Sequence, residues 1–149
     1  MEIERKYLVN CPPQDYSSYP FHRIEQAYLC TEPVVRIRRE DDSYYLTYKS
    51  KGLMVREEYN LPLTKEAYEH LLVKADGNIL TKKRYLLPVP GREDLTCELD
   101  IFEGKLKGLI LAEVEFETEA DASSFTAPSW FGTDVTHSGE YQNSRLSRL

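Results

Sequence analysis

The chain has 149 residues, of which 41% are hydrophobic and 30% are charged, an ordinary composition for a globular protein with one domain. Its formal net charge of −6 argues against a general nucleic-acid binder, which would usually be basic, although local clusters of Arg and Lys can still bind an anionic ligand. No apolar run approaches the roughly 20 residues that a bilayer-spanning helix needs, so no membrane association is expected.

The cysteines and the start of the chain indicate a compartment. Cys11, Cys30 and Cys97 are odd in number and lack the paired spacing of a metal site, so we expect free thiols in a reducing environment. The first patterned strand begins at Glu2, directly after the initiator, so neither a signal peptide nor a transit peptide is expected. These features predict a cytoplasmic protein, either a monomer or a homodimer.

The first part of the chain is predicted to be rich in strands. The expected strands are residues 1–9, 23–30, 34–40, 44–50 and 54–61. Residues 10–20 contain three prolines and are expected to form a loop, and residues 41–43 (Asp-Asp-Ser) a hairpin turn.

The second part of the chain adds helices and three further strands. A helix is predicted over residues 65–74, with Thr64 as its N-cap and the Asp-Gly-Asn sequence at 76–78 ending it. The remaining elements are strands at 79–88, 96–103 and 108–118 and short helices at 120–125 and 141–149. This order predicts an α+β fold, and eight strands is about the number that closes a small antiparallel β-barrel with room for one ligand. We therefore expect one domain over residues 1–149, with a few helices at its periphery.

Charged side chains alternate with hydrophobic ones along these strands, and the charges are sorted by sign. Because successive side chains of a strand point to opposite faces, one face of the sheet should be charged and the other apolar. The acids of the charged face are Glu2, Glu4, Glu58, Glu98, Asp100, Glu113 and Glu115, and its bases are Lys6, Arg36, Arg38, Lys49, Arg56, Lys82 and Arg84. On one strand alone, a solvated face with cross-strand ion pairs explains the pattern. Its repetition on every strand favours a sheet wrapped around a charged interior.

Closure of such a sheet would bring together acids from the first and the last strand. Glu2, Glu4, Glu113 and Glu115 would then repel one another unless a cation lay among them, and Mg²⁺ or Mn²⁺ suits a set of carboxylate oxygens. The Arg and Lys side chains opposite are suited to phosphate oxygens. A metal-bound polyphosphate would match both walls.

Short motifs occur along nearly the whole chain in a characteristic order. They are E-x-E-x-K at 2–6, Q-x-Y-L at 26–29, R-x-R at 36–38, L-T-x-K at 46–49, R-x-E at 56–58, K-x-R-Y at 82–85, E-x-D-x-F at 98–102 and G-L-x-x-x-E-x-E at 108–115. In this order the sequence resembles the CYTH family of triphosphate tunnel metalloenzymes. The resemblance implies an eight-stranded antiparallel tunnel that binds a triphosphate together with one or two divalent cations.

The resemblance also implies roles for individual residues. The implied metal ligands, direct or through water, are Glu2, Glu4, Asp100, Glu113 and Glu115, and the implied triphosphate ligands are Arg36, Arg38, Lys49, Lys82 and Arg84. Glu4, Glu58 and Lys6 are implied to be catalytic: Glu58 would reach a metal or orient a water, and Lys6 would contact phosphate or balance the acids. Gln26 and Tyr28 are expected either to pack or to contact the substrate.

The activity that the resemblance implies is metal-dependent hydrolysis of the terminal phosphoanhydride of a small triphosphate, first of all inorganic tripolyphosphate. Thiamine-triphosphatase activity, class IV-type adenylate cyclase activity and non-catalytic binding of polyphosphate or nucleotide in the same tunnel remain alternatives. A purely structural sheet with ion-paired faces is a further one. The short chain and the absence of an H-F motif favour a hydrolase over a cyclase. Trp130 is expected either to pack a turn against the barrel or to stack on a thiamine ring.

The C-terminal motif departs from the family pattern V-T-x-D-x-[RK]-Y-x-N. Ser138 stands in place of an acid and Glu140 in place of a base, whereas Tyr141 and Asn143 match. This segment is expected to form a lid or plug helix at one mouth of the tunnel, and His137 to be a surface residue. The departure bears on substrate preference.

Overall fold

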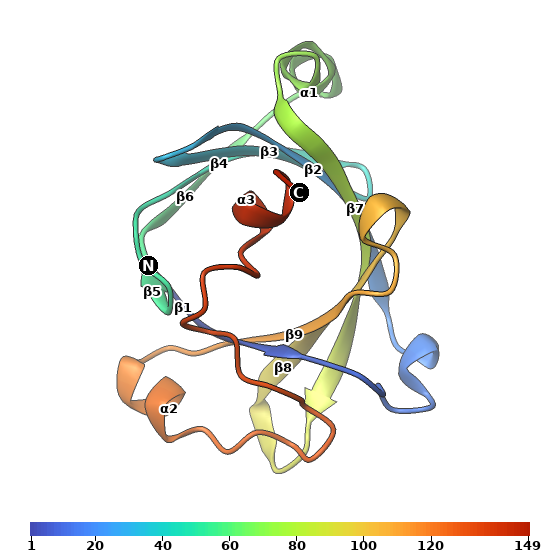
Figure 1. Cartoon of the computed structure of the whole chain (residues 1–149), viewed down its shortest axis with the longest axis vertical. Coiled ribbons are helices and arrows are strands. Elements are labelled where there is room, and N and C mark those ends of the chain that lie inside the picture. The colour runs from blue at the N-terminus through green and yellow to red at the C-terminus, as the bar shows by residue number, and fades with distance from the viewer.

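The strands form one sheet that closes into a barrel, with charged side chains facing inward and apolar side chains facing outward. The computed structural model describes residues 1–149, and nine antiparallel strands follow one another in the order β5-β1-β9-β8-β7-β2-β3-β4-β6 (Figure 1). The strands are β1 (Glu2–Leu8), β2 (Phe21–Thr31), β3 (Val34–Glu40), β4 (Ser43–Lys49), β5 (Val55–Arg56), β6 (Glu58–Pro62), β7 (Asp76–Val89), β8 (Arg92–Phe102) and β9 (Ile110–Glu115).

The barrel is closed by β5 and β6, which are two parts of one extended segment interrupted at Glu57. On one side β6 pairs with β4, and on the other β5 pairs with β1 through Glu2↔Arg56 and Ile3↔Val55. At the interruption, the Glu57 carbonyl accepts a hydrogen bond from the Ser50 N–H at 3.0 Å. Counting this segment as one strand gives the ring of eight that the sequence predicts, so the barrel prediction is confirmed.

The helices are short and lie outside the strands or at their ends. They are α1 (Lys65–Leu72), α2 (Glu119–Ser124) and α3 (Asn143–Leu146), with 3₁₀ turns η1 (Tyr16–Ser18) and η2 (Gly104–Leu106). Thr64 caps α1 as predicted, because its hydroxyl accepts a hydrogen bond from the Ala67 N–H at 3.1 Å. No helix combines the length and the apolar character that a membrane crossing requires.

The Asp-Gly-Asn sequence at 76–78 does not end α1, so that prediction is wrong. The helix ends at Leu72, and residues 76–78 instead open β7. Gly77 has φ +70, and a Cβ there would lie 2.5 Å from the Ser147 carbonyl oxygen. That carbonyl accepts a hydrogen bond from the Asn78 N–H at 2.6 Å, so the glycine serves the docking of the C-terminal segment.

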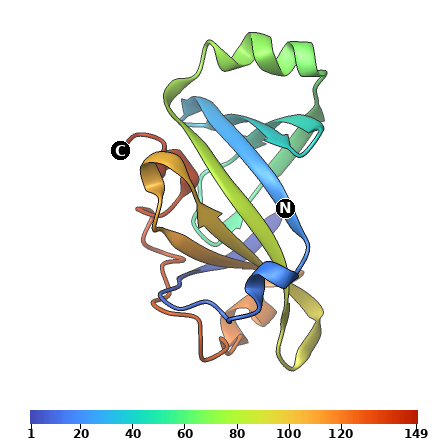
Figure 2. The ribbon, with the colours of Figure 1, turned by 90° about the vertical axis from the view of Figure 1, so that its right-hand side faces the viewer.

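The hydrophobic core lies on the outer faces of the barrel. Outward side chains such as Leu99 and Val114, neither exposed at all, pack beneath α2 and Phe131. On the opposite side, Ala27 and Ile37 pack against Tyr68 of α1. Figure 2 shows α1 and α2 at opposite ends of the molecule. Because the core is outside, the interior of the barrel is left to the charged residues.

One mouth of the barrel is filled by the end of the chain, which confirms the predicted plug. Leu80, Phe102 and Leu111, on the inner face of their strands, form an apolar cluster with Val135 and Leu146 of the C-terminal segment. In Figure 1 α3 lies inside the outline of the ring. The helical part of this plug is limited to Asn143–Leu146, shorter than the predicted 141–149.

Removal of an outward core side chain should destabilise the protein strongly. We expect Leu99→Ala to lower the free energy of unfolding by about 3 kcal/mol, because a fully buried leucine leaves a cavity. Leu61→Ala is the control, since Leu61 is 60% exposed, and should cost less than about 0.5 kcal/mol. Urea unfolding followed by circular dichroism measures both, and equal effects would contradict a core on the outer face.

Candidate functional site

The interior of the barrel contains a polar cavity of about 400 Å³. Only five of the 24 residues that line it are hydrophobic. The residues predicted for the site that line this cavity are Glu2, Glu4, Lys6, Arg36, Arg38, Lys49, Glu58, Arg84, Glu113 and Glu115. The volume suits one small ligand, and the lining suits a highly charged one.

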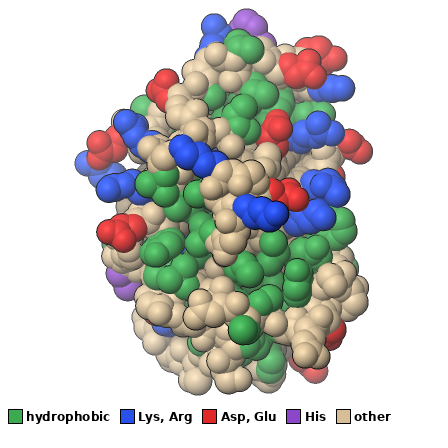
Figure 3. Space-filling model, turned by 45° about the vertical axis from the view of Figure 1, so that its right-hand side comes forward, with side chains coloured by type: hydrophobic (Ala, Val, Ile, Leu, Met, Phe, Trp, Pro, Cys, Tyr) green, Lys and Arg blue, Asp and Glu red, His purple; other side chains and the backbone are tan.

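Charge on the outside of the molecule is organised differently. On the face drawn in Figure 3, acidic and basic side chains are intermixed over the upper part, and hydrophobic side chains are frequent over the lower part. Inside the barrel, Arg36 and Arg38 of β3 lie on a basic wall, whereas Glu4 and Glu115 lie opposite each other on β1 and β9. The charges of the cavity that lack an ion-pair partner are thus separated by sign, whereas Lys6, Lys49 and Arg84 are paired with acids.

The basic wall has two arginines that no acid neutralises. Arg36 donates to the Thr47 hydroxyl at 3.3 Å, and its buried Nε has no hydrogen-bond partner. Arg38 donates through Nε and Nη2 to the Gln26 amide oxygen at 2.9 and 2.7 Å. Burial, together with the neighbouring Arg36 and Arg84, lowers the pKa of Arg38 to about 10. Two guanidinium groups with neutral partners only form a ready site for an anion.

Lys49 is held between two carboxylates. Its Nζ lies 3.0 Å from Glu2 Oε1 and 3.3 Å from Glu58 Oε2. Burial raises the pKa of Glu2. Burial also acts to raise the pKa of Glu58, but the hydrogen bond with Glu2 and the charge of Lys49 outweigh it and lower that pKa to about 2. Glu58 also accepts a hydrogen bond from Asn60 at 3.1 Å, so its carboxylate is ionised and fixed in place.

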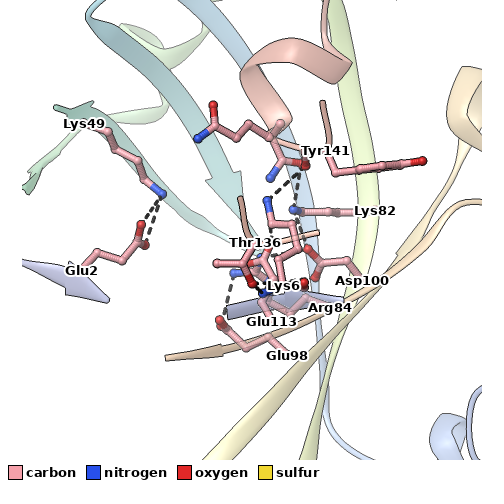
Figure 4. Close-up of polar contacts among 12 residues, drawn as sticks. Glu2, Lys6, Lys49, Lys82, Arg84, Glu98, Asp100, Glu113, Thr136 and Tyr141 are labelled. Carbon is pink, nitrogen blue, oxygen red and sulfur yellow. Dashed lines mark hydrogen bonds and ion pairs between the residues drawn. The ribbon is translucent and has the colours of Figure 1, made fainter. Parts of the chain in front are cut away.

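A second cluster of ion pairs centres on Asp100 of β8 (Figure 4). Arg84 donates to both oxygens of Asp100 at 2.7 and 2.9 Å, and Lys82 Nζ lies 2.7 Å from Oδ2. Arg84 further contacts Glu98 at 3.2 Å and Glu113 at 3.3 Å. Figure 4 shows this cluster standing apart from the Lys49–Glu2 pair.

Lys82 and Asp100 do not reach the cavity wall. Their exposed fractions are 1% and 0%, and neither belongs to the cavity lining, to which Arg84 does belong. Burial lowers the pKa of Lys82 to about 7, and against the effect of burial Arg84 and Lys82 hold the pKa of Asp100 below its usual range. In this arrangement Asp100 orients the Arg84 guanidinium toward the cavity, rather than facing the cavity itself as the resemblance implies.

The acidic wall is crowded. Glu4 lies opposite Glu115 across the β1–β9 pair, and Glu98 lies opposite Glu113 across the β8–β9 pair. Burial and the charges of Glu113 and Glu2 raise the pKa of Glu4 to about 8. Burial and the charges of Glu98 and Glu4 also raise the pKa of Glu115. Crowded carboxylates of this kind are relieved by a cation.

The donor set of the acidic wall fits a hard divalent ion, although no metal centre is preformed. No three Asp, Glu, His or Cys side chains lie close enough together to hold an ion. Glu113 Oε1, however, is buried without a hydrogen-bond partner, with Lys6 Nζ 3.4 Å away. Glu4 and Glu115 make no ion pair on this wall, whereas Glu113 is paired with Lys6 and Arg84 and Glu2 with Lys49.

Thr47 and Asn60 line the cavity, although no role is assigned to them from the sequence. Thr47 donates to the Asn60 amide oxygen at 2.6 Å and thereby links Arg36 to the Glu58 carboxylate. Of the two residues expected either to pack or to contact the substrate, Tyr28 lines the cavity. Gln26 accepts hydrogen bonds from the Arg38 guanidinium. The alternation of strands β4 and β6 identifies Thr47 and Asn60, because they share the inner face with Lys49 and Glu58.

The C-terminal segment contributes contacts to the site. Lys6 Nζ donates to the Tyr141 carbonyl oxygen at 3.1 Å, and Lys82 Nζ lies 3.4 Å from Asn143 Oδ1. The two departures from the family pattern, Ser138 and Glu140, are exposed and outside the cavity lining. They therefore do not touch a ligand in the barrel.

Trp130 and His137 both lie away from the cavity. Trp130 packs against Phe131 with ring centroids 4.6 Å apart, next to the outer core. It is absent from the cavity lining, so the packing alternative is the observed one. His137 is exposed, as predicted.

Comparison with known proteins gives consistent matches over the whole chain. Residues 1–148 match the CYTH domain. A protein of Nitrosomonas europaea named inorganic triphosphatase is 36% identical over 150 residues, which cover 98% of this chain and 96% of the relative. A second inorganic triphosphatase, from Acetivibrio thermocellus, is 33% identical over 97% of this chain and 92% of its own. The crystal structure of the inorganic triphosphatase NE1496 shares 34% identity, with a TM-score of 0.73 over 100% of this chain and 95% of that chain.

Loss of the Asp100 charge should destabilise the fold as well as disturb the site. We expect Asp100→Asn to lower the free energy of unfolding by about 3 kcal/mol, because two buried cations lose their anion. Asp94→Asn is the matched control: Asp94 also receives two hydrogen bonds from one arginine, Arg92, but on the surface. Chemical unfolding of both variants measures the difference, and an Asp100→Asn protein as stable as the control would contradict the assigned network.

Proposed function

The chain belongs to the CYTH domain family, and we propose that it is a metal-dependent hydrolase of the terminal phosphoanhydride of a small triphosphate, inorganic tripolyphosphate first of all. The observation that carries the proposal is the pair Arg36 and Arg38, two guanidinium groups that face the polar cavity of the barrel without acid partners. Two relatives matched over nearly their full length are named inorganic triphosphatases, which supports this substrate class.

The basic wall would bind the phosphates and stabilise charge in the transition state. Arg36 and Arg38 supply forked donors that match phosphate oxygens in pairs. Arg84, fixed by Asp100, adds a third guanidinium at the cavity wall. Because the wall is held by the sheet before the ligand arrives, little reorganisation is needed when charge shifts during bond cleavage.

The acidic wall would hold the cation. Glu4, Glu113 and Glu115 offer oxygen ligands of the kind that Mg²⁺ and Mn²⁺ prefer, and we expect one or two such ions. A bound divalent ion neutralises phosphate oxygens and lowers the pKa of a water molecule beside it. Lys6, between Glu113 and the Tyr141 carbonyl, balances the acids at this wall.

Glu58 would orient the attacking water rather than remove its proton. A carboxylate with a pKa of about 2 is a weak base at neutral pH, but it accepts hydrogen bonds well. Lys49 and Asn60 hold this carboxylate in one orientation at the cavity wall.

The setting of the activity follows from the same features. We propose a small-molecule substrate rather than a nucleic acid or a membrane, in keeping with the net charge of −6 and the small cavity inside the barrel. The three cysteines are free thiols, which supports a cytoplasmic protein. We expect it to act as a monomer or a homodimer.

The direct test is phosphate release from tripolyphosphate, ATP and thiamine triphosphate, each with Mg²⁺, with Mn²⁺ and with EDTA. We expect release that depends on the metal and is fastest with tripolyphosphate. Glu4→Gln should lower kcat at least about 100-fold while sparing part of the anion affinity, because it removes a cation ligand and leaves Arg36 and Arg38 in place. No release from any of the three compounds would overturn the proposal.

Arg38 should act on substrate affinity. Arg38→Gln should raise the KM for tripolyphosphate roughly 10- to 100-fold, the effect expected from losing a hydrogen bond to a charged group. Arg39→Gln is the control, because Arg39 follows Arg38 in β3 and its side chain is exposed on the outer face. Steady-state kinetics measure both; a KM for Arg38→Gln equal to that of Arg39→Gln would remove Arg38 from the binding wall.

A further inference from the structure

A second cavity adjoins the barrel cavity beside the C-terminal segment. This second cavity, of about 280 Å³, lies between the turn at residues 31–34, the loop at 50–53 and the C-terminal residues 142 and 144. We call this cavity the side passage. It shares with the barrel cavity the lining residues Val34, Lys49, Leu53, Arg56, Gln142 and Ser144. These shared side chains lie between the two spaces, and a hydrogen bond from Gln142 Nε2 to the Gly52 carbonyl at 3.1 Å joins the C-terminal segment to the loop there.

Arg56 stands between the two cavities with donors to spare. Its Nε donates to the Ser50 carbonyl at 3.0 Å, which is the one side-chain hydrogen bond of Arg56, and no carboxylate forms an ion pair with it. Among the cationic side chains of the barrel wall, Lys6, Lys49 and Arg84 each have a carboxylate partner. Arg56 therefore joins Arg36 and Arg38 as a guanidinium whose charge is not compensated.

The remaining charge around the side passage is mostly positive. Lys51 lines it, is exposed, and makes no ion pair through its ammonium group. Arg148 donates to the hydroxyl of Thr31, another lining residue, at 3.3 Å. Glu32 is the one lining acid, while Ser50, Gln142 and Ser144 add neutral polar groups. Cations with free donors and hydroxyl groups around a small cavity are the chemistry that recognises a phosphate group.

We propose that Arg56 and Lys51 form a second phosphate-binding position in the side passage, next to the triphosphate site. The proposal rests on the proposed function, because it takes the barrel cavity to hold a triphosphate. The phosphate has two possible sources: the fourth phosphate of a longer linear polyphosphate, or the orthophosphate that hydrolysis releases. In the first case Arg56 sets the chain length that the protein accepts, and in the second it retains a product.

Calorimetric titrations distinguish these sources. Glu4→Gln protein in Mg²⁺ buffer is titrated with tripolyphosphate, with tetrapolyphosphate, and with orthophosphate in the presence of saturating tripolyphosphate. When Arg56→Gln is added, the affinity for either tetrapolyphosphate or orthophosphate should fall at least about tenfold more than the affinity for tripolyphosphate. This is the loss expected when a hydrogen bond to a charged group is removed. A selective loss of tetrapolyphosphate identifies the fourth phosphate, and a selective loss of orthophosphate identifies the product.

The matched control is Arg39→Gln, whose Nε also donates to a backbone carbonyl, that of Asp41 at 2.8 Å, but on the outer face. It should change none of the three titrations. Lys51→Glu provides a second variant, on an exposed side chain whose replacement leaves the fold intact, and should weaken the same ligand as Arg56→Gln. If both variants leave tetrapolyphosphate and orthophosphate unchanged relative to tripolyphosphate, the second position does not exist. Wild-type protein that binds these ligands but hydrolyses none would instead overturn the proposed function alone.

Discussion

Buried charge is the constraint on which this structure depends. An ion removed from water costs several kcal/mol unless it is paired, and more than half of the residues that line the cavity of this barrel are charged. Asp100 meets that constraint for Lys82 and Arg84 at once, because it has no exposed surface and accepts hydrogen bonds from both side chains. Most hydrophobic residues lie on the outer faces, where α1 and α2 cover them, and the apolar cluster inside is confined to the mouth that the C-terminal segment fills. The usual arrangement of an apolar inside and a polar outside is thus inverted across the strands.

Some of the charged side chains inside the barrel form ion pairs, and others have no partner of opposite charge. Lys49, Lys82 and Arg84 have acid partners and act as a scaffold, whereas Arg36 and Arg38 have only neutral ones. On the opposite wall, Glu4 and Glu115 crowd each other instead of meeting these arginines. The strands hold the two walls apart, so the excess charges cannot neutralise one another. A ligand that carries its own cation and its own anion supplies what both walls lack.

Sequence alternation predicts which face a side chain takes, but not how deep it lies. The period of two along a strand is a local property, and it correctly placed Arg36, Arg38, Glu4 and Glu113 inside. Depth along the barrel depends on strand stagger and on the distant C-terminal segment, and neither is visible in a short motif. Lys82 and Asp100 therefore lie behind the cavity wall, although their motifs resemble those of the cavity residues. The prediction that Gly77 helps to end α1 is wrong for the same reason, because the backbone that it contacts, at Ser147, lies 70 residues further along the chain.

The closure of the ring is uneven, and this has a consequence for motion. β5 joins β1 through only two residue pairs, whereas β2 and β7 run beside each other over most of their length. The β1–β5 seam is therefore the junction that opens at the lowest free energy, and its amides should exchange with solvent before those of the other strand pairs. The seam divides β1 of the acidic wall from the segment that carries Arg56 and Glu58. Brief opening there would widen the barrel sideways, at a place distinct from the mouth that the C-terminal segment fills.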